Sequence, residues 1–220
     1  MQRALLGIAF VASCAATEGQ TRDRGVVWST VLDNGTVTVT RVHMPPGTAG
    51  YVDVPSAAIV MVQITPGDVE QSQNGENGRG PRPAGAVTYL PPGVPYRTVN
   101  IGKAAFDLLQ IKIKPTRAPA PAAPATDAPP GITRTAVVDN DVVRIVRVQF
   151  APGSSEPPHT HPNDLLTMQV TDGKVEMVAG TDRSSAVREG GFVQFLPRNV
   201  SHSYANADVK PFELLSVSIK

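Results

Sequence analysis

The sequence predicts an all-β fold built as two copies of one domain, and three observations support this prediction. The 220 residues include 19 glycines and 21 prolines, a composition that favours short strands and tight turns over helices. The chain also repeats itself at a constant offset of 106 residues, without a gap. Finally, apolar and polar residues alternate near the end of each copy, which is typical of half-buried strands.

The repeat extends over about ninety residues, which indicates two copies of one fold. The matched positions are mostly turn residues and apolar residues, such as Gly25 and Gly131, Asn34 and Asn140, Arg41 and Arg147, Gly67 and Gly173, Gly85 and Gly191, Asn100 and Asn206, and Phe106 and Phe212. Between the copies, residues 115–131 carry six prolines among alanines, so this segment is expected to be an extended spacer. We therefore expect a first domain over residues 22–114 and a second over residues 132–220.

Several elements can be located within the copies. Alternation predicts strands over residues 109–114 and 215–220, and a β-branched run predicts a third over residues 142–150. Residues 169–175 are expected to form a hairpin, because Asp172 and Gly173 suit a two-residue turn. Residues 71–83 are rich in Gln, Asn, Gly and Arg and are expected to form a loose hairpin loop. Short strands separated by turns indicate an antiparallel sandwich or barrel.

Residues 1–20 are expected to be an export leader. A short positive region precedes an apolar core from Ala4 to Ala12 and then small residues, as in secretory signals. The run that ends at Cys14 resembles the lipobox of bacterial lipoproteins, whose cysteine becomes the lipidated first residue, and cleavage near Cys14 by an ordinary signal peptidase is the alternative. The sequence thus predicts an exported protein, either periplasmic or anchored to the envelope by a lipid.

The composition limits the partners. A formal charge of +1 gives no basic field for nucleic acid. No apolar run approaches the roughly 20 residues that cross a bilayer. The expected partner is therefore a small molecule, and membrane contact is expected only through a lipid on Cys14.

Three of the four histidines lie at positions that the first copy does not share. His159 and His161 are two residues apart in an extended segment and would project to the same side, and His202 must approach from another strand. Imidazole suits Fe, Zn, Ni and Cu, so these residues predict a metal site in the second domain. The fourth histidine, His43, is expected to be an ordinary strand residue. The first copy has Asp53, Pro55 and Tyr96 at the matching positions.

Around the histidines, the second domain resembles the cupin superfamily. Gly153, five residues, His159-Thr160-His161 and then Gly173 are similar to the first cupin motif. Gly191, five residues, Pro197, His202 and Asn206 are similar to the second, with Asn199 where a glycine is usual. The resemblance implies a bicupin, two tandem jelly-roll barrels joined by the Pro/Ala-rich linker, with one divalent transition metal inside the second barrel.

The metal motif departs from the family pattern at one ligand. In the family, a glutamate five residues after the second histidine also binds the metal, and here that position is Leu166. On this alignment, Leu166→Glu is expected to restore a fourth ligand. Asp164 would point the same way as Leu166 in a regular strand, so it is a candidate substitute ligand or a partner that orients a histidine. An ordinary loop aspartate is the alternative. Asn206 is a further candidate for a substitute ligand or a partner of a ligand, and Asn206 and Tyr204 are candidates for the polar lining.

Two classes of function remain open. The resemblance implies a mononuclear dioxygenase-like enzyme, because relatives with three histidines and no glutamate include dioxygenases that act on diketones and on aromatic or thiol substrates. Fe(II) is then the favoured ion, with Zn, Ni, Mn or Cu as alternatives, and the substrate would be a small chelating molecule. The other class is a non-catalytic envelope protein that binds a metal or a small ligand.

Overall fold

The computed structural model describes residues 25–52, 55–114 and 128–220, and within them the chain forms antiparallel strands and no helix. The strands of the first domain are β1 (Val27–Asp33), β2 (Val37–Met44), β3 (Ala49–Val52), β4 (Ile59–Gln63), β5 (Gly67–Gln73), β6 (Glu76–Arg82), β7 (Val87–Leu90), β8 (Tyr96–Asn100) and β9 (Phe106–Ile113). Those of the second are β10 (Ile132–Asp139), β11 (Val143–Phe150), β12 (Asp164–Gln169), β13 (Gly173–Ala179), β14 (Asp182–Arg188), β15 (Val193–Leu196), β16 (His202–Asn206) and β17 (Phe212–Ile219).

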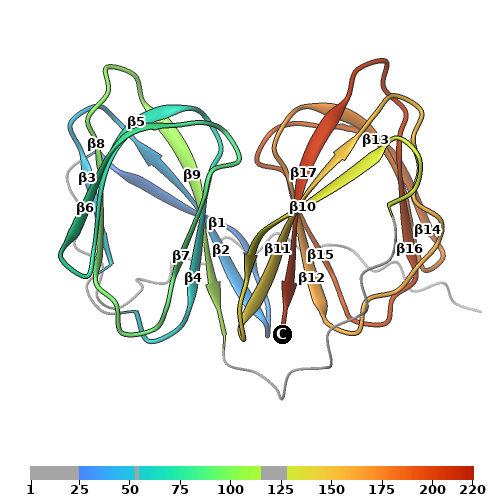
Figure 1. The fold of residues 1–220 in the computed structure, drawn as a ribbon, viewed down its shortest axis with the longest axis horizontal. Coiled ribbons are helices and arrows are strands. Elements are labelled where there is room, and N and C mark those ends of the chain that lie inside the picture. The colour runs from blue at the N-terminus through green and yellow to red at the C-terminus, as the bar shows by residue number, and fades with distance from the viewer. Residues whose placement is uncertain (1–24, 53–54, 115–127) are drawn as a thin grey trace, which may run out of the picture.

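Each domain is a barrel of two antiparallel sheets, and the two barrels lie side by side (Figure 1). One sheet has the order β1-β2-β9-β4-β7 in the first domain and β10-β11-β17-β12-β15 in the second. The other has the order β3-β8-β5-β6 in the first domain and β16-β13-β14, read in the same direction, in the second. The predicted all-β fold of two tandem barrels is confirmed, and the shared strand order explains the sequence repeat.

The predicted turns at residues 169–175 and 71–83 differ from the structure. Asp172 and Gly173 do not join a hairpin, because β12 pairs with β15 and β17 whereas β13 pairs with β14 and β16. This segment crosses from one sheet to the other. Residues 71–83 are not loose, since β5 and β6 pair closely around Asn74 and Gly75, whose φ angles are 50° and 82°. Two adjacent residues with positive φ match the twist of a tight hairpin.

A repeated glycine explains part of the internal homology. A Cβ atom on Gly67 would lie 2.5 Å from the Phe106 ring, and one on Gly173 would lie 2.7 Å from Phe212. Each phenylalanine is almost fully buried at the start of the last strand of its domain. Any larger residue would displace this ring from the barrel core, so both copies require glycine here.

One hydrophobic core lies between the two domains and joins them. It contains residues from β2, β4 and β9 of the first barrel and from β11, β12 and β17 of the second, including Val60, Ile111, Ile145, Leu166 and Val217. The core inside the second barrel is a separate cluster that includes Phe150, Leu165 and Phe212. The large sheet of the second barrel therefore has two buried faces, one toward its own interior and one toward the other domain (Figure 1).

The predicted leader, with Cys14, lies outside the described residues, as does most of the predicted linker. Among the residues that the structure describes, no helix is long and apolar enough to cross a membrane.

Candidate metal centre

The three histidines predicted as metal ligands come together at one end of the second barrel. His202 begins β16, and the segment that carries His159 and His161 occupies the place that β3 takes in the first barrel. His159 and His202 face each other as an isolated bridge, and the backbone N–H of each donates to the carbonyl of the other over 2.9 Å. The Asn199 N–H donates to the His161 carbonyl over 2.8 Å. Backbone pairing thus places the histidine segment against β16.

The turn before His202 requires an unusual backbone conformation. Asn199 has a φ of 61°, which is uncommon for residues other than glycine but tolerated by asparagine. The positive φ agrees with the position of Asn199 at the place in the motif where a glycine is usual.

The three imidazole rings form a compact group. One nitrogen from each ring can be chosen so that all three lie within 4.8 Å of one another. The ring centroids are 5.0 Å apart for His159 and His161, 4.5 Å for His159 and His202, and 5.1 Å for His161 and His202. Among the described residues, this is the group of His, Cys, Asp and Glu side chains close enough to hold an ion.

Backbone carbonyls orient two of the rings. Nδ1 of His159 lies 2.9 Å from the Pro157 carbonyl, and Nδ1 of His202 lies 3.1 Å from the Val200 carbonyl. Because a carbonyl only accepts hydrogen bonds, Nδ1 is the protonated nitrogen in each ring and Nε2 keeps a free lone pair. Both rings thus present the nitrogen that can ligate a metal.

The surroundings keep His161 and His202 neutral. Burial, reinforced by the imidazoles of His202 and His159 and by Arg134, lowers the pKa of His161 to about 4. Burial also lowers the pKa of His202, although its hydrogen bond to Val200 acts in the opposite direction. A metal ligand must be a neutral imidazole, so the donor set fits a divalent transition metal.

The histidines line an open cavity of about 430 Å³ inside the second barrel. One wall is apolar and includes Val148, Phe150, Leu165 and Leu214. The polar lining residues include Arg134, Glu156, Thr167, Tyr204 and Ser216. This volume lies in the range of pockets that enclose small organic molecules.

The structure corrects the assignment of Leu166 to the glutamate position. Leu166 is fully buried in the core between the two domains, on the face of β12 that points away from the histidines. Its neighbour Leu165 lines the cavity instead, as does Thr167. Of the two leucines, Leu165 is therefore the one at which a glutamate would face the cavity. Leu165, like Leu166, cannot bind a metal.

Asp164 is not brought together with the histidines. Its carboxylate accepts hydrogen bonds from the Thr36 hydroxyl of the first domain at 2.9 Å and from the Arg198 backbone N–H at 2.9 Å. Because side chains alternate along β12, Asp164 shares the interdomain face with Leu166. Its expected role as a substitute ligand or as a partner of a histidine is corrected to a contact between the domains.

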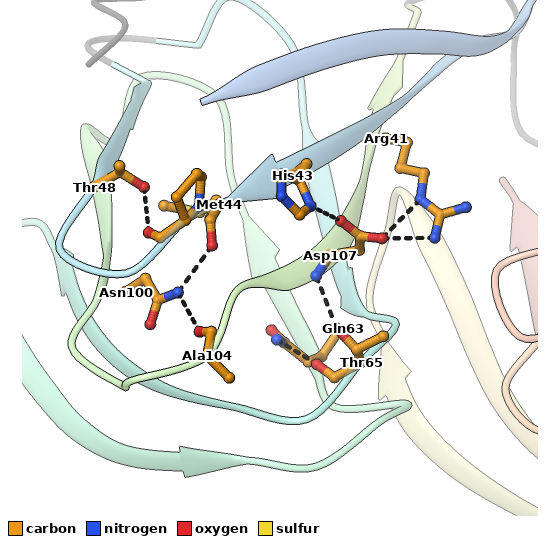
Figure 2. Close-up of polar contacts among 10 residues, drawn as sticks. Arg41, His43, Met44, Thr48, Gln63, Thr65, Asn100, Ala104 and Asp107 are labelled. Carbon is orange, nitrogen blue, oxygen red and sulfur yellow. Dashed lines mark hydrogen bonds and ion pairs between the residues drawn. The ribbon is translucent and has the colours of Figure 1, made fainter. Parts of the chain in front are cut away.

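Asn206 has a structural role that both copies share. Its side-chain amide donates to the Phe150 and Lys210 carbonyls at 3.0 and 2.9 Å, and its oxygen accepts from the Asp208 N–H. Asn100 makes the matching bonds to Met44, Ala104 and Gly102 in the first barrel, and Figure 2 shows those to Met44 and Ala104. Asn206 therefore fixes a turn rather than lining the cavity, in contrast to the expectation from the motif.

Tyr204 lines the cavity, as expected, and belongs to a small polar group. Its hydroxyl lies 3.1 Å from the Thr167 hydroxyl and 3.3 Å from the Gln194 side-chain oxygen, to which it donates. Burial raises the pKa of Tyr204, so the phenol stays protonated at neutral pH. No sequence motif marks Thr167 or Gln194, because their positions depend on strand pairing across the barrel.

A pair of charged residues in the cavity has no recognisable signal in the sequence. The Arg134 guanidinium donates to the Glu156 carboxylate over 2.6 Å, and both residues line the cavity with the histidines. Glu156 lies three residues before His159, and its backbone N–H donates to the Tyr204 carbonyl over 2.8 Å. Arg134 lies on β10, so only the closed barrel brings the two residues together.

The matching positions of the first barrel are arranged differently. Tyr96, at the position of His202, is buried in an apolar cluster with Ile59, Met61 and Leu90. His43 is exposed on β2, where its Nδ1 lies 2.7 Å from Asp107, which also accepts from Arg41 (Figure 2). His43 is therefore a surface strand residue, as expected. Asp53 lies outside the described residues.

Comparisons with known proteins agree with this geometry. A family model described as "Cupin domain" matches residues 146–218. No curated protein matches the chain in sequence. A cupin 2 conserved barrel domain protein from Leptotrichia buccalis is similar in structure, with a TM-score of 0.63 and 18% identity over 91% of each chain.

Two enzymes of known structure share the fold. The salicylate 1,2-dioxygenase of Pseudaminobacter salicylatoxidans has a TM-score of 0.66 and 13% identity, covering 88% of this chain and 76% of that one. A mutant of Bacillus subtilis oxalate decarboxylase has a TM-score of 0.64 and 12% identity, covering 95% and 79%. Such low identities establish the fold alone. The match over residues 146–218 identifies the second domain as a cupin domain, and the chain as a whole has the fold of the cupin proteins to which it is similar.

Proposed function

We propose that this chain is an exported cupin that binds one divalent transition metal through His159, His161 and His202. The observation that carries the proposal is the convergence of three imidazole nitrogens within 4.8 Å of one another at the wall of an open cavity. Imidazole ligation suits Fe, Zn, Ni and Cu. A bound ion with three neutral ligands would keep its full charge and have open positions for a small chelating molecule.

The protein's own residues supply the surroundings of that ligand. The carbonyls of Pro157 and Val200 fix the orientation of two imidazoles. The apolar wall with Val148, Phe150 and Leu214 excludes water from one side of the cavity. The protonated Tyr204 hydroxyl is part of a hydrogen-bonded group with Thr167 and Gln194 that can contact a polar ligand atom.

Elemental analysis of protein purified without a histidine tag or chelators tests the metal site. About one equivalent of metal is expected, and His202→Ala should weaken binding by more than the roughly 10–100-fold that loss of an outer partner costs. His43→Ala is the matched control, because His43 is exposed on the other domain. Absence of metal after titration, or equal effects of the two substitutions, would refute the site.

Within this proposal, a mononuclear Fe(II)-type dioxygenase is favoured over a non-catalytic binder. The cavity opens beside the three histidines, and a salicylate 1,2-dioxygenase is among the proteins that share the fold. Oxygen uptake by the iron-loaded protein with small chelating acids, diketones and thiols distinguishes the two. Uptake that depends on both iron and the added compound supports an enzyme, whereas ligand binding without uptake supports the binder.

Export is the remaining part of the proposal and rests on the sequence of residues 1–20. Fractionation of cells that express the full chain should place it in the periplasm or with the membrane. If Cys14 carries a lipid, Cys14→Ala should release membrane-bound protein into the soluble envelope fraction. Full-length protein in the cytoplasm would refute export.

A further inference from the structure

The cavity beside the three histidines has an excess of positive charge. Its charged lining residues are Arg134, Arg144, Lys220 and Glu156, that is, three cations and one anion. Arg144 and Lys220 share the carboxylate of Asp139, which lies outside the lining and is about half exposed. A cavity whose walls carry one dominant sign of charge concentrates ligands of the opposite sign.

Arg134 is the cation of the lining whose ion-pair partner, Glu156, also lines the cavity. Its electrostatic influence reaches His161, and its partner Glu156 influences both His202 and Tyr204. The Glu156 side chain is only 9% exposed, whereas that of Arg134 is 28% exposed. The acid is therefore on the buried side of the pair and the guanidinium on the accessible side.

The Arg134 guanidinium has N–H donors that its hydrogen bond to Glu156 does not use. An arginine carries five N–H donors in a planar fork, and its bond to Glu156 uses an N–H of one terminal nitrogen. The fork matches a carboxylate, which it can bind through two parallel hydrogen bonds. Val148, the cross-strand neighbour of Arg134, lines the cavity with Phe150 and Leu214, and these side chains suit an apolar organic body.

We propose that Arg134, held by Glu156, selects a small organic acid whose carboxylate binds the guanidinium while the rest of the molecule reaches the histidines. This deepens the proposed function and rests on the metal site described above. The ligand is thus an anion with an apolar or aromatic body that fits a cavity of about 430 Å³. Glu156 is a positioning residue, because its single described hydrogen bond from a side chain fixes Arg134.

Calorimetric titration of the zinc-loaded full-length protein tests this inference. The probes are three acids and their uncharged amides, namely 2-hydroxybenzoate, glycolate and pyruvate against 2-hydroxybenzamide, glycolamide and pyruvamide. Each pair keeps the overall shape and the hydroxyl or keto group, and replaces the charged carboxylate by a neutral amide. At least one acid should bind about 10–100-fold more tightly than its amide, as expected for a hydrogen-bonded charge.

Matched variants assign this preference to Arg134. Arg134→Gln should abolish it, and so should the double variant Arg134→Gln/Glu156→Gln, which does not leave the buried Glu156 carboxylate unpaired. Arg183→Gln, an exposed site on β14, should leave it unchanged. Zinc content is measured in every sample, and thermal unfolding confirms that the variants fold.

The outcomes separate this inference from the metal site. Full zinc content without any acid preference, or a preference that persists in both Arg134 variants, overturns the role of Arg134 and leaves the metal site intact. If the protein takes up no zinc but still prefers the acid in an Arg134-dependent way, the inference is supported and the metal site is refuted. If the protein neither takes up zinc nor prefers any acid over its amide, both the metal site and the role of Arg134 are refuted.

Discussion

Adjacent residues on β12 have opposite environments. Leu165 faces the cavity and Leu166 faces the other domain, because side chains alternate along a strand. A shift of one residue in the alignment therefore exchanges a ligand position for an interdomain position. The same alternation places the Asp164 side chain at the interface between the domains and the Thr167 side chain in the cavity.

Glutamate substitutions at these two leucines should have opposite effects. Leu165→Glu is expected to tighten divalent-metal binding, because it adds a carboxylate to the cavity that the histidines line. Leu166→Glu is expected to lower the free energy of unfolding by about 3–5 kcal/mol, because it buries an unpaired charge between the domains. Metal titration and urea unfolding of both variants check this. Tighter metal binding by Leu166→Glu would contradict the assignment of faces.

The histidine cluster should make the metal-free protein sensitive to acid. Because the pKa of His161 is lowered from 6.5 to about 4, the unfolded chain binds more protons than the folded protein between these values. The free energy of unfolding should therefore be highest above pH 6.5 and fall as the pH decreases toward 4. Urea unfolding over this range measures the slope, which should be smaller for His161→Asn. Equal slopes for the two proteins would contradict this prediction.

At the level of the strands, an asparagine at the same position of each copy joins strand ends within its barrel. Asn100 ends β8 and Asn206 ends β16, and each bonds the end of the second strand of its domain and the turn before the last strand. The hydrogen bonds of one buried side chain thus join three segments that are distant in the sequence. This accounts for an asparagine at the same position of both copies.

Removal of this side chain should destabilise the domain without removing the histidines. Asn206→Ala leaves the buried Phe150 carbonyl without its side-chain donor and is expected to cost about 1–3 kcal/mol of unfolding free energy. Ser203→Ala, on the same strand and only half-buried, is the control and should cost less. Chemical unfolding measures both. Equal stability of Asn206→Ala and the parent protein would show that the turn does not depend on this amide.

At the scale of the whole molecule, the two barrels share one hydrophobic core. Gly85 and Gly191 are equivalent in the repeat, and each packs against the other domain. A Cβ on Gly85 would lie 2.9 Å from Val170, and one on Gly191 would lie 3.1 Å from Ile64. Val170 and Ile64 are themselves equivalent, so the interface is symmetric in its contacts. Arg147 adds a hydrogen bond to the Gly85 carbonyl at 2.7 Å.

The second domain should not remain monomeric alone. A fragment of residues 128–220 would expose the interdomain face, which includes Val143, Val217 and Ile219. Such a large apolar surface favours self-association. Light scattering after size-exclusion chromatography should show oligomers of the fragment, whereas a fragment with all three residues changed to Thr should associate less. A monomeric unmodified fragment would contradict the proposed importance of this interface.

The all-β class, the duplication and the three candidate ligands can be predicted from the sequence, because strand periodicity, turn residues and short motifs are local properties. The sequence could not place Leu166, Asp164 or Asn206, since the face of a strand and the partner of a turn depend on distant pairing. Alternation along β17 showed a half-buried strand, but its apolar face covers the other domain and Ser216 and Ser218 line the cavity. The tertiary structure alone brought Arg134 to Glu156, because a barrel joins residues from separate strands only when it closes.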